Sequence, residues 1–80
     1  YLITLLKNQN GLCALSKREM TRIVGNNSKC NTNMSIDRID SNEGYIPGNV
    51  QLVCADVNLA KNDLSQKEFL KLCRTISKNN

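Results

Sequence analysis

The chain has no histidine and no tryptophan, and only three aromatic residues and one proline among its 80 residues. Without histidine it has no imidazole, the side chain that exchanges protons near neutral pH. So few aromatic residues leave the core to Leu, Ile, Val and Cys. No apolar run approaches the ~20 residues that a membrane-spanning helix needs, so we expect no membrane partner. The length suits one small domain, and we treat residues 1–80 as a single domain.

The charge is positive and the cysteines are widely spaced. Eleven Lys and Arg against seven Asp and Glu give +4, which favours a polyanionic partner. The cysteines are Cys13, Cys30, Cys54 and Cys73. We expect an intracellular, reducing location with these thiols free or bound to metal, and two disulfides are the alternative. The opening YLITLL is too short for a signal peptide, and the absence of an initial Met leaves open that the chain is part of a longer protein.

The pattern of apolar residues predicts a mixed α and β chain. Leu2, Leu5 and Leu6 recur at helical spacing, which predicts a helix over residues 2–9. The polar segment 25–33 is expected to be a loop. The other predicted elements are strands at 35–40 and 50–54, a wide loop between them that contains Pro47 and Gly48, and a helix from 55 to about 62.

A further helix is predicted at the C-terminal end, where the local signal is clearest. Ser65 and Glu68 have the Ser-x-x-Glu spacing of a capping box. Apolar residues then follow along one face of the expected helix: Phe69, Leu70, Leu72, Cys73 and Ile76. Cys73 is accordingly expected to be a core thiol.

Strand, wide loop, strand and helix form a ββα unit over about residues 35–62. It presents polar side chains from each part: Asp37 and Arg38, Asn49 at the end of the loop, and Asn58 and Lys61 from the helix. Oxygen atoms of Asp37 and Asn58 suit a hard divalent cation such as Mg²⁺ or Mn²⁺. Such a cation neutralises charge on a phosphodiester.

The order and spacing of these residues resemble the motif of the HNH endonucleases, also called ββα-metal or His-Me finger nucleases. The stretch NVQLVCADVNLAK (49–61) matches the second half of that motif, and IDRI (36–39) matches the first half. GLCALS (11–16) resembles the zinc knuckle that often precedes it, and the form SIDRIDSNEGYIPGNVQLVC (35–54) is similar to a phage-type branch. The resemblance implies an α+β fold in which a ββα-metal core, an antiparallel hairpin plus a helix, is flanked by N- and C-terminal helices.

The resemblance also implies a function, a metal-dependent DNA endonuclease or nickase in the cytoplasm of a bacterial or phage-infected cell. Asp37, as an exposed ligand, and Asn58 would bind one Mg²⁺ or Mn²⁺. Asn49 would tie the loop to the first strand. Lys61 would lie near a DNA phosphate. Apart from the resemblance, Tyr45 is a candidate to stack on a base or sugar, and the alternative is a loop aromatic that pins the hairpin.

The resemblance breaks at the catalytic base, because Arg38 stands where the family has its histidine. Arginine is a poor base but a good phosphate clamp, since its guanidinium is planar and permanently charged. Three explanations stay open: a water on the cation attacks without a dedicated base, Asp40 helps, or this version no longer cuts. The alternative function is therefore a catalytically inactive DNA-binding module on the same fold, and the third is a small interaction or zinc-binding domain.

The zinc knuckle is incomplete as well. The family's pattern would need cysteines at 13, 16, 54 and 57, where this chain has Cys13, Ser16, Cys54 and Val57. We therefore expect no structural zinc and take Cys13 and Cys54 as packed remnants of the knuckle. A rearranged site that recruits Cys30 and Cys73 is the alternative. The sequence does not predict the cleavage site, the strand that is cut or the oligomeric state.

Overall fold

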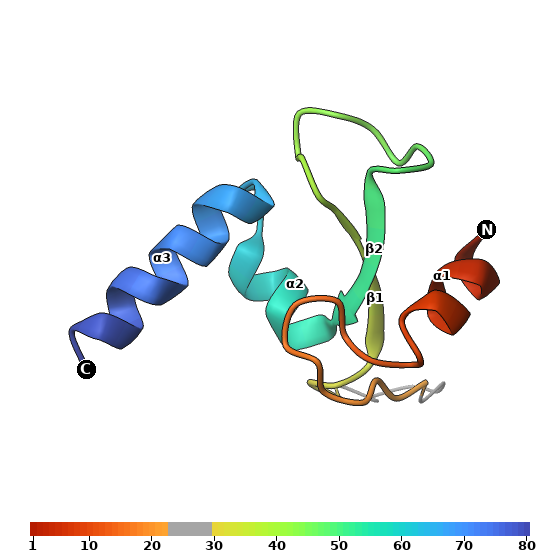
Figure 1. Ribbon diagram of the computed structural model, residues 1–80, viewed down its shortest axis with the longest axis horizontal. Helices are drawn as coiled ribbons and strands as arrows, with labels where there is room; N and C mark the ends of the chain where they lie inside the picture. Colours follow the sequence, from red (N-terminus) through yellow and green to blue (C-terminus); the bar gives the residue numbers. More distant parts are fainter. Residues whose placement is uncertain (23–29) are drawn as a thin grey trace.

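A computed structural model describes residues 1–22 and 30–80 (Figure 1). Along these residues the order is α1 (Leu2–Asn8), β1 (Met34–Arg38), β2 (Val50–Cys54), α2 (Ala55–Lys61) and α3 (Gln66–Lys78). The α+β class is therefore confirmed, and each predicted strand and helix is present. The predicted loop at 25–33 falls partly on residues 23–29, which lie outside the described residues. None of the described helices is both long enough and apolar enough to cross a membrane.

The two strands form an antiparallel hairpin. Met34 is paired with Cys54 at one end, and Arg38 is paired with Val50 at the other. The loop that joins them ends in a tight turn, in which the amide of Asn49 donates to the carbonyl of Ile46 at 2.9 Å. Pro47 and Gly48 occupy the two central positions, and Gly48 has φ +89°, a value that a type II turn requires and glycine tolerates. The whole connection runs from the end of β1 at Arg38 to the start of β2 at Val50, so the predicted wide loop is confirmed.

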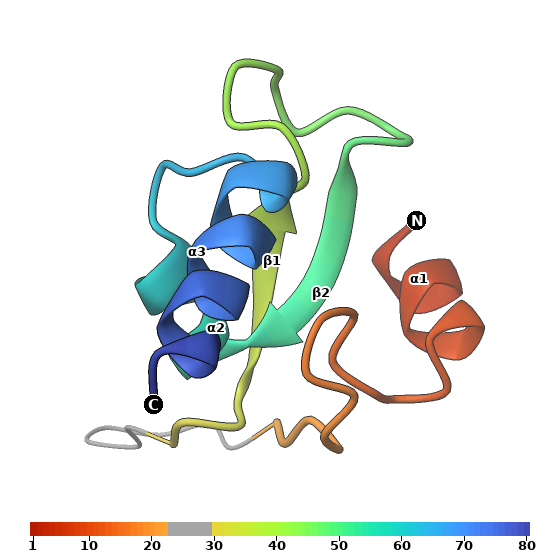
Figure 2. The same ribbon diagram turned by 60° about the vertical axis from the view of Figure 1, so that its left-hand side comes forward.

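Strand β2 lies in the interior, and all five of its residues are buried. Helix α1 packs beside it, while α2 packs against both strands (Figures 1 and 2). The side chain of Gln9 completes the hydrogen bonding of Leu52, accepting from its amide at 3.1 Å and donating to its carbonyl at 2.9 Å. The outer edge of β2 is therefore covered rather than open to other strands.

A small core joins the start of the chain to the end of β2. Cys13, Val53 and Cys54 are fully buried there, and Val57 packs against them. The Cys13 sulfur accepts hydrogen bonds from the amides of Ser16 and Cys54, each at 3.3 Å. Burial raises the pKa of the Cys13 thiol, but hydrogen bonds with the Ser16 side chain and with these backbone amides outweigh burial and bring the pKa to about 7. The predicted packing of Cys13 and Cys54 is confirmed.

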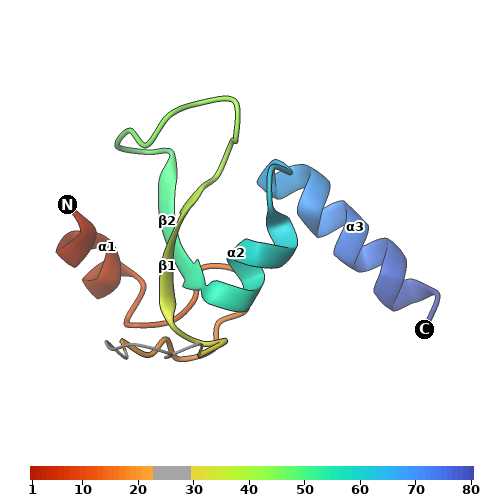
Figure 3. The ribbon, with the colours of Figure 1, turned by 180° about the vertical axis from the view of Figure 1, so that it is seen from behind.

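Helix α3 begins at the predicted capping box and then runs away from the hairpin (Figures 1 and 3). Ser65 Oγ accepts from the amide of Glu68, and the Glu68 carboxylate accepts from the amide of Ser65, both at 3.2 Å. Phe69 is buried, but Leu72 is 46% and Ile76 is 56% exposed. Cys73 is exposed too, so its predicted role as a core thiol is wrong. The apolar face continues beyond the part of the fold that could cover it.

Candidate functional site

A cleft of about 390 Å³ opens beside β1 and α2. Its lining includes four of the predicted site residues, Asp37, Arg38, Tyr45 and Asn58, together with Asp63, which follows α2. These side chains come from the first strand, the loop, the helix and the segment after the helix. The hairpin and α2 therefore gather on one surface residues that the sequence separates by more than 20 positions.

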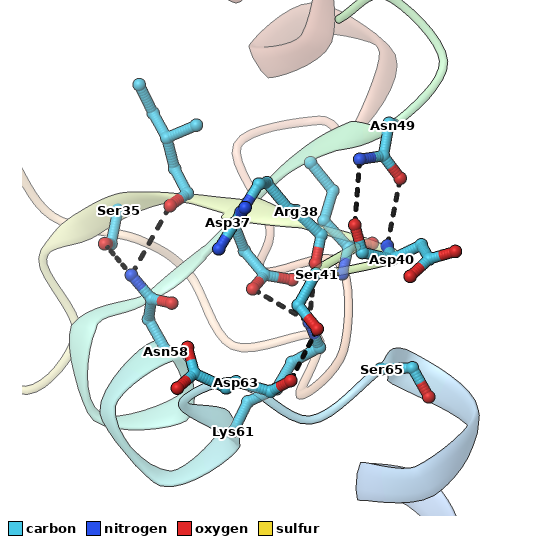
Figure 4. Close-up of polar contacts among 12 residues, drawn as sticks. Ser35, Asp37, Arg38, Asp40, Ser41, Asn49, Asn58, Lys61, Asp63 and Ser65 are labelled. Atoms are coloured by element: carbon cyan, nitrogen blue, oxygen red, sulfur yellow. Dashed lines mark hydrogen bonds and ion pairs between the residues drawn. The ribbon is translucent and has the colours of Figure 1, made fainter. Parts of the chain in front are cut away.

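Asp37 is held from two sides inside this site. Its carboxylate accepts from Lys61 Nζ through Oδ1 at 3.0 Å (Figure 4). It also accepts from Gln51 Nε2 through Oδ2 at 2.8 Å. Only 4% of Asp37 is exposed. The prediction of an exposed Asp37 is wrong, because α2 packs directly against β1 and encloses the carboxylate.

Lys61 is the most deeply buried charged residue among those described, with 1% of its surface exposed. Its ammonium donates to the Asp37 carboxylate and, at 2.6 Å, to the carbonyl of Arg38. An enclosed ammonium does not reach a phosphate on a bound duplex, so the burial of Lys61 does not favour its predicted contact with DNA. Lys61 instead ties the end of α2 to β1 and balances the charge of Asp37.

Gln51 is a site residue that the sequence reasoning missed. It lies directly opposite Asp37 in the hairpin register, and it is buried. A buried polar side chain needs a hydrogen-bond partner, and the one that Gln51 finds is the Asp37 carboxylate. The signal was present in the sequence, since Gln51 is the one polar residue in the apolar strand VQLVC.

Asn58 presents its amide oxygen without a hydrogen-bond donor from the described part of the chain. Its nitrogen donates to Ser35 Oγ and to the carbonyl of Ile36, both on β1, which fixes the orientation of the amide (Figure 4). The oxygen is then the atom left for a ligand. Asn58 and Asp37 therefore offer neutral and charged oxygens to the same cleft.

This donor set fits a hard divalent cation that is only partly held by protein. Mg²⁺ commonly takes one or two protein oxygens and fills its other positions with water and phosphate. Within residues 1–22 and 30–80, no three or more His, Cys, Asp or Glu side chains lie close enough together to bind a metal ion by themselves. Because Lys61 also offsets the charge of Asp37, we expect the cation affinity to depend on phosphate oxygens brought by a substrate.

Arg38 and Tyr45 form the outer wall of the cleft. The guanidinium of Arg38 lies over the Tyr45 ring, 5.3 Å from its centre, and also donates to the carbonyl of Glu43 at 3.4 Å. Tyr45 is 66% exposed. A cation–π contact of this kind restrains the arginine while its remaining N–H groups stay available for an anion.

Asn49 makes the contact that the resemblance implies, tying the loop to the end of β1. Its amide oxygen accepts from the backbone N–H of Asp40 at 2.9 Å, and its nitrogen donates to the carbonyl of Asp40 at 3.1 Å (Figure 4). The nitrogen also donates to the carbonyl of Gly44 at 2.9 Å. The side chain of Asn49 thus acts inside the loop and does not line the cleft. It sets the position of the strand end that carries Arg38.

A second acidic residue, Asp63, lines the cleft. Asp40, which the sequence offered as a helper in catalysis, does not line it. Asp40 Oδ1 accepts from the amide of Asn42 at 3.0 Å, a local turn contact. Asp63 reaches the cleft because Asn62 ends α2 with φ +49° and turns the chain back, and Ser41 Oγ donates to the Asp63 carbonyl. Nothing in the local sequence predicts this return, so the sequence reasoning missed Asp63.

The two other cysteines do not join Cys13 and Cys54. Cys30 lies instead within hydrogen-bond distance of the hydroxyls of Thr21 and Thr32, at 3.4 and 3.2 Å. These contacts, first that of Thr21, lower the pKa of the Cys30 thiol to about 7. Cys73 is exposed on α3. The alternative of a zinc site rearranged around Cys30 and Cys73 therefore has no support in this arrangement.

Comparison with known proteins gives one informative match. No protein-family model matches the chain, and no solved structure matches it. The chain is 38% identical over 69 residues to an uncharacterized protein of Acanthamoeba polyphaga mimivirus. That alignment covers 79% of this chain but only 13% of the viral protein, so the likeness concerns a short part of a much longer polypeptide.

Proposed function

We propose that this chain is an HNH-type endonuclease domain that uses one Mg²⁺ or Mn²⁺ to hydrolyse phosphodiester bonds in DNA, with its hairpin and α2 as the ββα-metal core. The observation that carries the proposal is the convergence of Asp37 on β1 and Asn58 on α2 at one cleft, with Arg38 at its wall. The free amide oxygen of Asn58 supports the ligand assignment, and the loop contacts of Asn49 support the resemblance on which it rests.

The protein residues have separate tasks in this proposal. Gln51 and Lys61 orient the Asp37 carboxylate, and Ser35 orients the amide of Asn58, so both oxygens are held before substrate arrives. The cation, when bound, supplies positive charge for the phosphodiester and the leaving oxygen. Arg38 holds a phosphate oxygen through its N–H groups and does not accept a proton.

Nicking of supercoiled plasmid by the purified chain tests this proposal. We expect nicked circles to accumulate with Mg²⁺ or Mn²⁺ and not with EDTA. The second candidate, a DNA-binding module without catalysis, is favoured by the absence of any histidine. DNA binding without nicking under any of these metals would establish that second candidate instead.

Variants of Arg38 test its assignment to phosphate contact. We expect Arg38→Ala to weaken DNA binding and to lower the nicking rate roughly tenfold or more, in the range of a lost charge-assisted hydrogen bond. Arg38→His should raise the rate near neutral pH, because imidazole accepts protons there. Arg22→Ala, which removes an exposed arginine outside the cleft, is the matched control. Equal DNA affinity and equal nicking in Arg38→Ala and the parent chain would refute the assignment.

A further inference from the structure

Helix α3 carries most of the excess positive charge of the chain. It contains four basic residues, Lys67, Lys71, Arg74 and Lys78, and one acidic residue, Glu68, so it contributes +3 of the net +4. All four basic residues are exposed. The rest of the chain, with seven basic and six acidic residues, is close to neutral.

The four basic residues form a single stripe, which we call the α3 basic stripe. Their spacing of four, three and four residues places them within roughly 60° around the helix axis and along roughly 16 Å of its length. The same arithmetic places Phe69 and Ile76 on the opposite side of the helix. Because Phe69 is buried against the fold, the α3 basic stripe faces away from it.

The start of α3 is attached to the proposed catalytic cleft. The amide of Gln66 donates to the carbonyl of Ile39 at 2.9 Å, which joins the helix to the residue that follows β1. Asp63, three residues before α3, lines the cleft itself. From this attachment α3 runs outward, away from the hairpin and α1 (Figures 1 and 3). The α3 basic stripe therefore extends from the edge of the cleft.

We propose that the α3 basic stripe binds the phosphate backbone of duplex DNA and supplies most of the DNA affinity of the chain. A line of four cations matches the dense negative charge of a duplex backbone, which carries about one charge per 1.7 Å. Lys61 is enclosed, so this surface replaces it as the source of phosphate contacts. The inference uses the DNA partner of the proposed function but does not require that the chain cuts DNA.

An anionic membrane is the competing partner for a basic amphipathic helix. In a helix that lies in a membrane surface, the apolar face enters the lipid and the basic face stays at the headgroups, so the apolar face must be free. Phe69, on the apolar face of α3, is buried against the fold, so the first turns of that face are not free to enter lipid. The geometry of α3 therefore favours DNA.

A matched pair of triple variants tests this inference in the full chain. Lys67→Gln/Lys71→Gln/Arg74→Gln removes three charges from the stripe, and Lys7→Gln/Lys17→Gln/Arg22→Gln removes two lysines and one arginine from exposed positions elsewhere. Binding to a fluorescent duplex is measured in EDTA from 50 to 200 mM salt, with circular dichroism to confirm that both variants are folded. Vesicles with and without anionic lipid are titrated in parallel.

We expect the stripe variant to lose about three phosphate contacts. The slope of log affinity against log salt concentration should then become less steep by about 2.7. Between about 50 and 200 mM salt this difference amounts to roughly 40-fold in affinity. The control variant should change the slope by less than about 1. Equal losses in the two variants, unchanged affinity in the stripe variant, or binding to anionic vesicles but not to DNA would overturn the inference. Stripe-dependent binding without plasmid nicking would leave it standing and would refute the nuclease function alone.

Discussion

Lys61→Met is expected to lower the free energy of unfolding by about 3–5 kcal/mol, the usual cost of removing one partner from a buried ion pair. The substitution leaves the Asp37 carboxylate enclosed without its cation, with only Gln51 as a hydrogen-bond donor. Methionine is similar to lysine in length, so the loss reports the charge and hydrogen bonds more than a cavity. Urea or thermal denaturation of the variant and the parent chain measures it.

Two further variants make this test specific. Lys67→Met removes an exposed lysine and should change the unfolding free energy by less than about 0.5 kcal/mol. The double variant Asp37→Leu/Lys61→Met removes both charges, and we expect it to recover much of the stability lost in Lys61→Met. If Lys61→Met were as stable as Lys67→Met, Lys61 would be solvent-exposed and its assignment to DNA contact would return.

Asn58→Ala is expected to reduce metal-dependent nicking by at least about 100-fold. Changes to the groups that merely support metal ligands already cost about 10–100-fold, and Asn58 is proposed as a ligand itself. Asn58→Asp keeps an oxygen at the same position and should retain substantial activity. Both variants should be folded, because the hydrogen bonds lost to Ser35 and Ile36 are worth only about 1 kcal/mol each.

Leu59→Ala is the matched control for Asn58→Ala. Leu59 is the next residue of α2, lines the same cleft and is largely exposed, so its removal should leave the nicking rate within a factor of about two to three. Nicking by Asn58→Ala at the rate of Leu59→Ala would exclude Asn58 as a ligand. Asp37 is a poorer probe, because its substitution also disturbs the buried Lys61.

The strands and the last helix were predictable because their signals are local. The capping box of Ser65 and Glu68 forms both of its hydrogen bonds, and the short, mostly apolar run VQLVC marks β2 within its observed bounds. The Pro47-Gly48 pair likewise specifies its own turn. Such features depend on a few neighbouring residues and on backbone geometry that the rest of the fold does not change.

The burial of individual side chains was not predictable in the same way. A lysine near a helix end is usually solvated, and only the packing of α2 on β1 encloses Lys61. The apolar face of α3 shows which side of the helix avoids water, but the pattern does not say how much of that face the fold covers. Leu72, Cys73 and Ile76 therefore lie exposed, although the pattern alone places them in a core.

The most direct test of the proposed cation site is paramagnetic broadening by Mn²⁺ in the ¹H–¹⁵N spectrum of the chain, which detects weak binding without DNA. We predict that substoichiometric Mn²⁺ first broadens the side-chain amide of Asn58 and the backbone amides of Asp37 and Arg38. The backbone amides of Asp37 and Arg38 should stay sharp in Asn58→Ala. Broadening centred on other carboxylates such as Glu43 or Asp56, or identical broadening in the parent chain and Asn58→Ala, would contradict the assignment of Asp37 and Asn58 as the cation ligands.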